Sequence, residues 1–330
     1  MANATESTAV EAEFTQRADP FRRELLAHCY RMTGSLDDAE DMVQETYVRA
    51  WRAYGDFEGR SSLRKWLYSI ATNVCLTELR RGARRSLPSG ISAPSADPDA
   101  TAAGPPPGVE WVQPLPDALV APASDDPSVV AESRASLRLA LIASLQILPP
   151  RQRAVVILRE VLAWSAAEVA DALGVTTPAV KSLLQRARAR IQQEAPAEED
   201  LVEPTLPEER ALLDAYMGAF ERSDVRLLEQ VLRADAAIEV LPSSTWFSGL
   251  ATCLRYLSGH AVGTPGDWRM LPTAANGQPA AAAYLLAPDG SYRAFGVGVL
   301  TVTGGRIVRI TAFTDPDLVA RFALPASLPG

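Results

Sequence analysis

Apolar residues recur at helical spacing over two separate stretches of the chain. The first covers residues 19–86, where Pro20 suits a first helical turn and Gly34 ends the opening helix. A serine precedes each later helix, Ser35 for the second and Ser61 or Ser62 for the third. The spacing predicts three packed helices, whose apolar stripes are Leu25, Cys29, Met32; Leu36, Ala39, Val43, Tyr47, Ala50, Tyr54; and Leu63, Trp66, Leu67, Ile70, Val74, Leu79.

The second helical stretch covers residues 128–195 and contains the pattern of a helix-turn-helix. Ser165 is placed to cap a short helix, and Gly174 supplies a left-handed turn. Thr177 is expected to cap the next helix, with Pro178 in its first turn. A plain helical hairpin with a solvated basic face is the alternative. It explains less, because the caps, the turn glycine and the basic face all agree.

The second helix of this motif enters the major groove of DNA by its N-terminal end. Its apolar stripe leaves a polar face free for contact with DNA. Four residues on that face are positioned to reach base edges: Thr177, Lys181, Ser182 and Gln185. Three arginines further along are positioned to contact phosphates: Arg186, Arg188 and Arg190.

The remaining segments differ from these helices in composition. Residues 1–18 are expected to be disordered, residues 87–127 to form a Pro- and Ala-rich linker without its own core, and residues 196–207 to form a connector. Residues 208–330 begin with helical spacing and continue with the alternation of β-strands, in which Gly304-Gly305 indicates a hairpin turn.

Charge is segregated along the chain, although the net charge of −8 alone would argue against binding to nucleic acid. Basic residues collect between Arg60 and Arg85 and again between Lys181 and Arg190, whereas acids collect between Asp37 and Glu45. Two basic surfaces on an acidic chain predict contact with DNA at two places and a protein partner at the acidic helix.

Several classes of protein are excluded or disfavoured by the sequence. We expect a cytoplasmic protein that does not insert into a membrane, because neither a secretory signal nor a long apolar segment is present. The three cysteines are widely spaced, which indicates buried free thiols. With only two histidines and no catalytic motif, we expect no metal, no cofactor and no enzymatic activity.

The sequence pieces DDAEDMVQETYVRAW, FEGRSSLRKWL and IATN closely resemble region 2 of the extracytoplasmic-function (ECF) sigma factors, and LPPRQRAVVILREVLAWSAAEVADALGVTTPAVKSLLQRAR resembles their region 4. The resemblance implies a subunit that binds core RNA polymerase, at the clamp of the largest subunit and the flap of the second-largest, and directs it to promoters. It also implies that region 4 reads the −35 element.

The same resemblance assigns roles within residues 19–86. Asp41, Gln44 and Glu45 would dock on the polymerase clamp. The loop Gly55 to Arg60 and the following helix would grip the −10 element and its melted strand, through Arg60, Arg64, Lys65, Tyr68, Thr72, Asn73, Arg80 and Arg81. Trp66 is expected to be a core residue, since it shares a stripe with Ile70.

The C-terminal third resembles SnoaL-like, or nuclear-transport-factor-2-like, domains, which implies an α+β cone fused to two all-α domains. Candidate pocket residues are Trp246, Tyr256, Trp268, Tyr284 and Phe295, and core packing is the plainer explanation for each. We expect this domain to modulate the sigma factor, with an anti-sigma protein or a small ligand as a further partner. The alternatives are a one-component transcriptional regulator, or a DNA-binding module fused to an isomerase- or cyclase-like enzyme.

Overall fold

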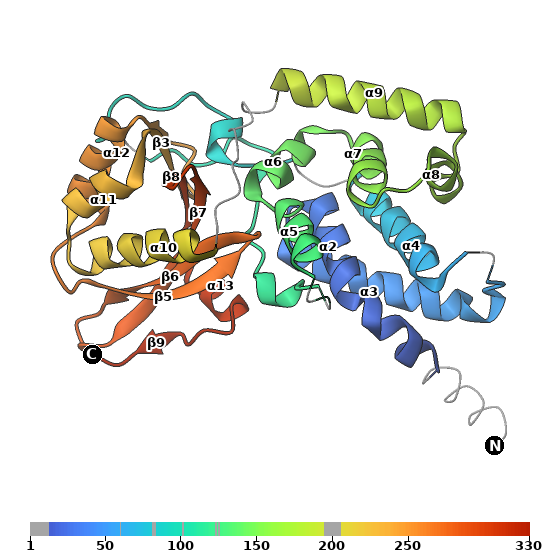
Figure 1. Cartoon of the computed structure of the whole chain (residues 1–330), viewed down its shortest axis with the longest axis horizontal. Helices are drawn as coiled ribbons and strands as arrows, with labels where there is room; N and C mark the ends of the chain where they lie inside the picture. The colour runs from blue at the N-terminus through green and yellow to red at the C-terminus, as the bar shows by residue number, and fades with distance from the viewer. Residues whose placement is uncertain are drawn as a thin grey trace. The chain divides into compact units, whose positions relative to one another are not determined.

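The computed structural model describes residues 13–59, 61–80, 84–100, 102–122, 124, 126–194 and 206–330. The chain divides into two compact units (Figure 1). Unit 1 comprises Met1–Arg85 and Leu119–Ala195, and unit 2 comprises Ser86–Ala118 and Pro196–Gly330.

The N-terminal part of unit 1 is a bundle of α2 (Arg22–Thr33), α3 (Leu36–Ala53) and α4 (Leu63–Glu78). Ser35 and Ser62 cap α3 and α4, accepting hydrogen bonds from the amides of Asp38 (3.1 Å) and Lys65 (3.3 Å). The predicted stripes form the core, with Leu25, Met32, Val43, Leu67 and Val74 fully or almost fully buried. The prediction of three packed helices is therefore confirmed.

The N-terminus departs from the expectation of disorder within its described part. Residues 13–18 are helical and lead into a 3₁₀ turn, Asp19–Phe21. Phe14 is buried, and its ring meets those of Tyr47 (6.1 Å) and Tyr54 (5.2 Å) edge-on. A single aromatic side chain docked on α3 orders this segment, and a periodicity criterion cannot detect one residue. The rest of the predicted disordered stretch, residues 1–12, lies outside the described residues.

The C-terminal part of unit 1 is built from α5 (Pro127–Ala135), α6 (Leu139–Ile147), α7 (Pro150–Val156), α8 (Ala166–Leu173) and α9 (Thr177–Glu194). A π-helical turn, Ile157–Val161, continues α7. The core is apolar, with Ile142, Leu145, Val155 and Ile157 fully buried.

The C-terminal part of unit 2 combines helices with a seven-stranded sheet. The helices are α10 (Leu206–Glu221), α11 (Val225–Val231), α12 (Leu250–Tyr256) and α13 (Pro316–Arg321). The strands are β3 (Leu232–Leu241), β4 (Trp246–Ser248), β5 (Trp268–Ala275), β6 (Gln278–Leu286), β7 (Tyr292–Thr303), β8 (Arg306–Phe313) and β9 (Ser327–Leu328). Their order is β4-β3-β8-β7-β6-β5, with β9 on β7. Only the β3–β8 pairing is parallel among those described.

The sheet curves around a filled apolar core, which gives the α+β domain that the sequence predicts. The register between β6 and β7 shifts at Ala283/Tyr284, so Phe295 is the extra residue of a β-bulge. Tyr216 and Phe220 of α10 fill the concave side together with Trp268 and Leu300. Gly304 and Gly305, both with positive φ (57° and 70°), make the predicted hairpin turn between β7 and β8.

Residues 86–118 do not form a free linker, as the sequence suggested, but lie along the C-terminal part of unit 2. After β1 (Arg84–Ser86), the segment includes a 3₁₀ turn, Pro88–Gly90, and β2 (Val109–Trp111), and a further 3₁₀ turn, Asp117–Leu119, ends it. Leu115 is fully buried, and its amide and carbonyl exchange hydrogen bonds with Asn276 Oδ1 and N, both 2.9 Å. The segment has no core of its own, but the domain beside it supplies one.

Candidate nucleic-acid interface

The helix-turn-helix is formed by α8 and α9 as the sequence predicts. Ser165 Oγ accepts from the Glu168 amide (3.2 Å), and the Glu168 carboxylate accepts from the Ser165 amide (2.8 Å), which makes a complete capping box. Gly174 ends α8 in the left-handed conformation, at φ 61°. The cap of α9 differs from the prediction: Thr176 Oγ1, not Thr177, accepts from a backbone amide, that of Ala179 (3.3 Å).

The predicted base-reading face of α9 is open to solvent. Lys181, Ser182 and Gln185 are exposed, whereas Val180 and Ala187 are buried on the opposite side. Thr177 is half-buried at the start of the helix. Because the exposed residues lie in the first half of α9, they occupy the part of a recognition helix that reaches base edges.

Two of the arginines of α9 form ion pairs on the surface. Arg186 and Arg188 are exposed, and Arg188 pairs with Glu160 at 2.6 Å. Arg190 is half-buried and pairs with Glu194 one turn along the helix, at 3.0 Å. Exposed pairs of this kind contribute little stability, so phosphate groups can replace the carboxylates.

The predicted −10 residues on α4 do not form one exposed face. Tyr68 and Thr72 are buried, which corrects the expectation that they grip DNA. Tyr68 Oη donates to Glu24 Oε2 (3.2 Å), and Thr72 Oγ1 donates to the Tyr68 carbonyl (2.7 Å). Burial raises the pKa of the Tyr68 hydroxyl above its ordinary range. Trp66 is half-buried, with its ring 4.8 Å from that of Phe57.

The remaining α4 residues are accessible but engaged. Arg64 pairs with Glu24 at 2.6 Å, and Lys65 forms an ion pair with Glu168 of α8. Asn73 is exposed and donates to the carbonyl of Ala172, also on α8 (3.1 Å). Arg80 is exposed, whereas Arg60 and Arg81 lie outside the described residues.

The predicted polymerase-docking residues lie on α3. Asp41 and Gln44 are exposed, and half-buried Glu45 pairs with Arg49 at 2.6 Å. Sequence reasoning missed Val48 and Trp51 on this helix, which are 40% and 42% exposed. The signal was present, since both residues fall outside the buried stripe of α3 and large apolar side chains in that position usually mark a contact surface.

The structure places Arg153 and His28 in the interior of unit 1. Arg153 lies on α7, and its guanidinium is buried, which lowers its pKa to about 10. His28 is buried with Nε2 2.9 Å from Thr72 Oγ1, and burial, with the nearby Arg31 charge, lowers its pKa to about 3. Since Thr72 donates elsewhere, we infer that neutral His28 donates through Nε2.

The five aromatic residues proposed for a pocket in unit 2 do not converge on one. Trp268 belongs to the apolar core, and Tyr256 and Phe295 pack against that core. Tyr284 is buried and donates to the Pro325 carbonyl (2.9 Å), whereas Trp246 donates to the Ser92 carbonyl (2.8 Å). Core packing therefore accounts for three of them, and attachment of neighbouring segments accounts for the other two.

Acidic and histidine side chains of unit 2 have separate partners. Asp235 pairs with Arg233 at 2.5 Å, and His260 pairs with Asp99 at 2.8 Å. Within the described ranges, no group of three or more His, Cys, Asp or Glu side chains is arranged to hold a metal ion. No helix there has both the length and the apolar character to cross a bilayer.

Residues 18–85 match the family model of sigma-70 region 2, and residues 138–191 match that of sigma-70 region 4. The chain is 48% identical over 318 residues to the ECF RNA polymerase sigma factor SigG of Mycobacterium tuberculosis, which covers 96% of this chain and 85% of SigG. This chain therefore belongs to the ECF sigma factors, which direct transcription initiation by RNA polymerase.

One solved structure has a similar fold over nearly the whole chain. The crystal structure of M. tuberculosis SigJ covers 93% of this chain and 97% of SigJ, with a TM-score of 0.59 at 23% identity. An NTF2-like protein of Mesorhizobium loti is similar over 33% of this chain and 92% of its own, with a TM-score of 0.28 at 18% identity. The predicted combination of sigma regions 2 and 4 with a C-terminal α+β domain is confirmed. Family membership also decides against the one-component regulator.

Proposed function

We propose that this sigma factor reads its −35 element with the exposed face of α9 and its −10 element with the face of α4 that carries Lys65 and Asn73. The observation that carries the proposal is the open first half of α9, where Lys181, Ser182 and Gln185 stand clear of the core. Arginines further along the same helix supply phosphate contacts, which add affinity without sequence choice.

Two substitutions on α9 test this division of roles. Gln185→Ala removes a base-reading amide and should change sequence preference, by about 1–3 kcal/mol at one base position. Arg188→Ala should weaken binding to all duplexes and lower the salt slope of binding by about one. Binding is measured with a randomised duplex library and by salt titration. If both variants lose affinity without a change in preference, the assignment of bases to Gln185 is wrong.

We further propose that α3 docks on the polymerase clamp through Asp41, Gln44 and Glu45, with Trp51 at the same surface. Exposed acids suit a basic partner surface, and Trp51 supplies apolar contact area beside them. An exposed tryptophan on a helix that also carries acids is more typical of a protein interface than of a DNA-binding face.

Unit 2 is proposed to modulate transcription by holding the segment that joins regions 2 and 4. Backbone and side-chain contacts support this: the Ser89 amide donates to buried Glu239 (2.9 Å), and Trp111 Nε1 donates to the Pro242 carbonyl (3.1 Å). A free chain of this length could change its end-to-end distance at little cost, whereas a bound one cannot.

The test of modulation uses the full-length chain with Trp111→Ala and Asn276→Ala together. Transcription from a cognate promoter by reconstituted holoenzyme should change several-fold, while sequence preference stays the same. Glu229→Ala, an exposed change on α11, is the matched control. Unchanged transcription in the double variant would refute the modulatory role of this attachment.

A further inference from the structure

Helix α8 of region 4 lies against the face of α4 in region 2 that carries Lys65 and Asn73. Glu168 forms an ion pair with Lys65, and the Ala172 carbonyl accepts from Asn73 Nδ2 (3.1 Å). The Trp164 ring, just before α8, lies 6.0 Å from Lys65 Nζ and meets the Tyr68 ring edge-on at 6.3 Å. The contact thus combines a charge pair, a hydrogen bond and aromatic packing.

The donors used in this contact are those that a melted −10 strand would need. Asn73 Nδ2 carries two hydrogens, and it donates to Ser69 O (2.9 Å) as well as to Ala172 O, so both are occupied. Glu168 presents a carboxylate to Lys65, where a nucleic-acid strand would present a phosphate. The carboxylate of Glu168 stays ionised near neutral pH, because hydrogen bonds from Lys65 and Ser165 lower its pKa to about 2.

We propose that α8 is a built-in competitor for the −10 surface of α4, so that the described arrangement of unit 1 is a closed state that single-stranded promoter DNA must displace. The proposal rests on the −10 role proposed above for Lys65 and Asn73.

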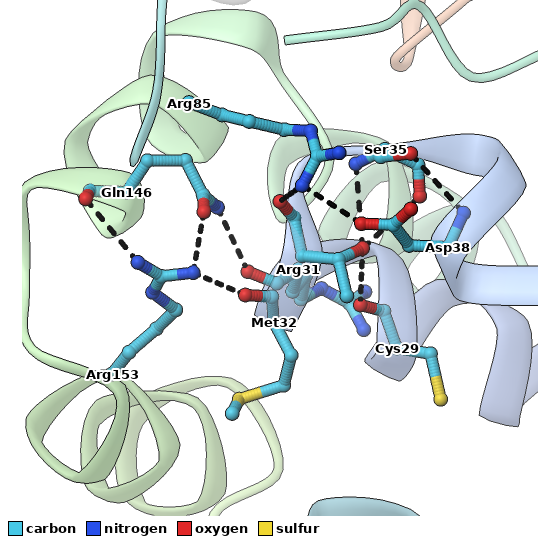
Figure 2. A network of polar contacts seen from close by, with 9 residues as sticks. Cys29, Arg31, Met32, Ser35, Asp38, Arg85, Gln146 and Arg153 are labelled. Carbon is cyan, nitrogen blue, oxygen red and sulfur yellow. Dashed lines mark hydrogen bonds and ion pairs between the residues drawn. The ribbon is translucent and has the colours of Figure 1, made fainter. Parts of the chain in front are cut away.

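A second contact holds the two regions together at the C-terminus of α2, where helix carbonyls lack partners within the helix (Figure 2). Gln146 Nε2 donates to Arg31 O (3.3 Å), and Arg153 donates to Met32 O. Arg85 Nη1 lies 3.5 Å from Thr33 O and pairs with Asp38 at 2.8 Å. Gln146 and Arg153 come from the region 4 side, so region 4 caps a helix of region 2.

We call this second contact, formed by Gln146 and Arg153 at the C-terminus of α2, the latch. It is suited to release because its central cation, Arg153, is held by uncharged groups. The hydrogen bonds of Arg153 go to the carbonyls of Met32, Gln146 and Leu148 and to the Gln146 amide oxygen. Arg153 Nε has no hydrogen-bond partner among the described residues. Opening breaks the bond to Met32 O, whereas the bonds to Gln146 and Leu148 lie within region 4. The opened guanidinium recovers hydration that burial removed, which offsets the loss of the bond to Met32.

Charge-neutralising variants of α8 test the competition directly. Glu168→Gln removes the charge that faces Lys65 and keeps an oxygen that can accept from the Ser165 amide. Asp171→Asn removes the same charge from an exposed position of α8 and is the matched control. The probe is a fluorescein-labelled 20-nucleotide single strand of random sequence, bound to the full chain and followed by anisotropy.

Glu168→Gln should tighten binding of this probe by about twofold to fivefold, and Asp171→Asn should tighten it less. Arg153→Met, which releases the latch while filling the same volume, should act in the same direction. Equal tightening by Glu168→Gln and Asp171→Asn would show a general charge effect and overturn the competition. No tightening by Glu168→Gln would also overturn it.

Lys65→Gln in the Glu168→Gln background separates this inference from the proposed function. Loss of the gained affinity supports both. If Lys65→Gln has no effect on binding, Lys65 does not contact the strand, and the −10 assignment fails together with the inference. If Lys65→Gln weakens binding but Glu168→Gln changes nothing, the −10 assignment stands and the competition is wrong.

Discussion

Helices α4 and α9 both carry the polar residues of a DNA-binding surface, but the structure treats them differently. On α9 the polar face stands in solvent, and its stripe of Val180 and Ala187 is buried behind it. On α4 two of the polar residues, Tyr68 and Thr72, are part of the core, Lys65 and Asn73 contact α8, and Arg64 pairs with Glu24 of α2. The surface of α9 is open to a ligand, whereas the surface of α4 must first lose its contacts with α8.

The difference teaches that polarity marks a binding face only when the helix has enough apolar residues to fill its buried side. In α9 the apolar stripe fills the buried side of the helix, so the polar residues of the base-reading face are not needed in the core. In α4, His28 of the neighbouring helix brings a polar group into the core, and Thr72 is buried to satisfy it. A buried polar residue then needs its own partners, which removes it from the surface.

The largest expected effect tests whether Tyr68 belongs to the core. Tyr68→Ala should lower the free energy of unfolding by about 3–5 kcal/mol, because it leaves a cavity in the core. Gln185→Ala on α9 should change it by less than about 0.5 kcal/mol. Urea unfolding followed by tryptophan fluorescence measures both. Similar losses of unfolding free energy in the two variants would contradict the proposed difference between α4 and α9.

A pH-dependent effect of intermediate size tests the buried polar pair. His28 has a pKa of about 3 in the folded chain against an ordinary value of 6.5, so the unfolded chain binds its proton first as pH falls. The stabilisation is complete above pH 6.5 and is lost progressively toward pH 3, at up to about 1.4 kcal/mol per pH unit.

His28→Asn should therefore flatten the dependence of unfolding free energy on pH between 6.5 and 5. The slope is compared rather than the absolute stability, since His28→Asn also changes packing. An unaltered slope in His28→Asn would mean that His28 is not the titrating group.

The smallest expected effect sharpens the description of α9. Arg188 is paired with Glu160 through an exposed ion pair, so Glu160→Gln should free it for phosphate. Nonspecific duplex affinity should rise by no more than about fivefold at low salt, and the gain should shrink as salt is added. Fluorescence anisotropy in 50 and 200 mM salt would measure it. A gain that is independent of salt would contradict an electrostatic origin.

Most of the fold could be predicted from the sequence, because serine caps, Gly34, Gly174 and the apolar stripes each act over one or two turns of helix. The exposed face of α9 followed from the same local pattern. The burial of Tyr68, Thr72 and Arg153 could not be predicted, since it depends on which distant residues meet them. Arg153 in particular donates to the carbonyl of Met32, which is distant from it in the sequence. The local spacing of residues around Arg153 cannot reveal that a carbonyl at the end of α2 lacks a hydrogen-bond donor.

Residues 86–118 are attached largely through their own backbone groups. The Ser95 amide donates to the Trp246 carbonyl (2.7 Å), and the Leu115 amide and carbonyl bond to Asn276 Oδ1 and Asn276 N. Backbone groups are the same whichever side chain they carry. Such a segment can therefore exchange one small residue for another during evolution, while an insertion or deletion would misplace its anchors. Across related chains, the length of this segment should therefore be preserved more than its sequence. Its low complexity is consistent with a backbone path that many small residues can follow.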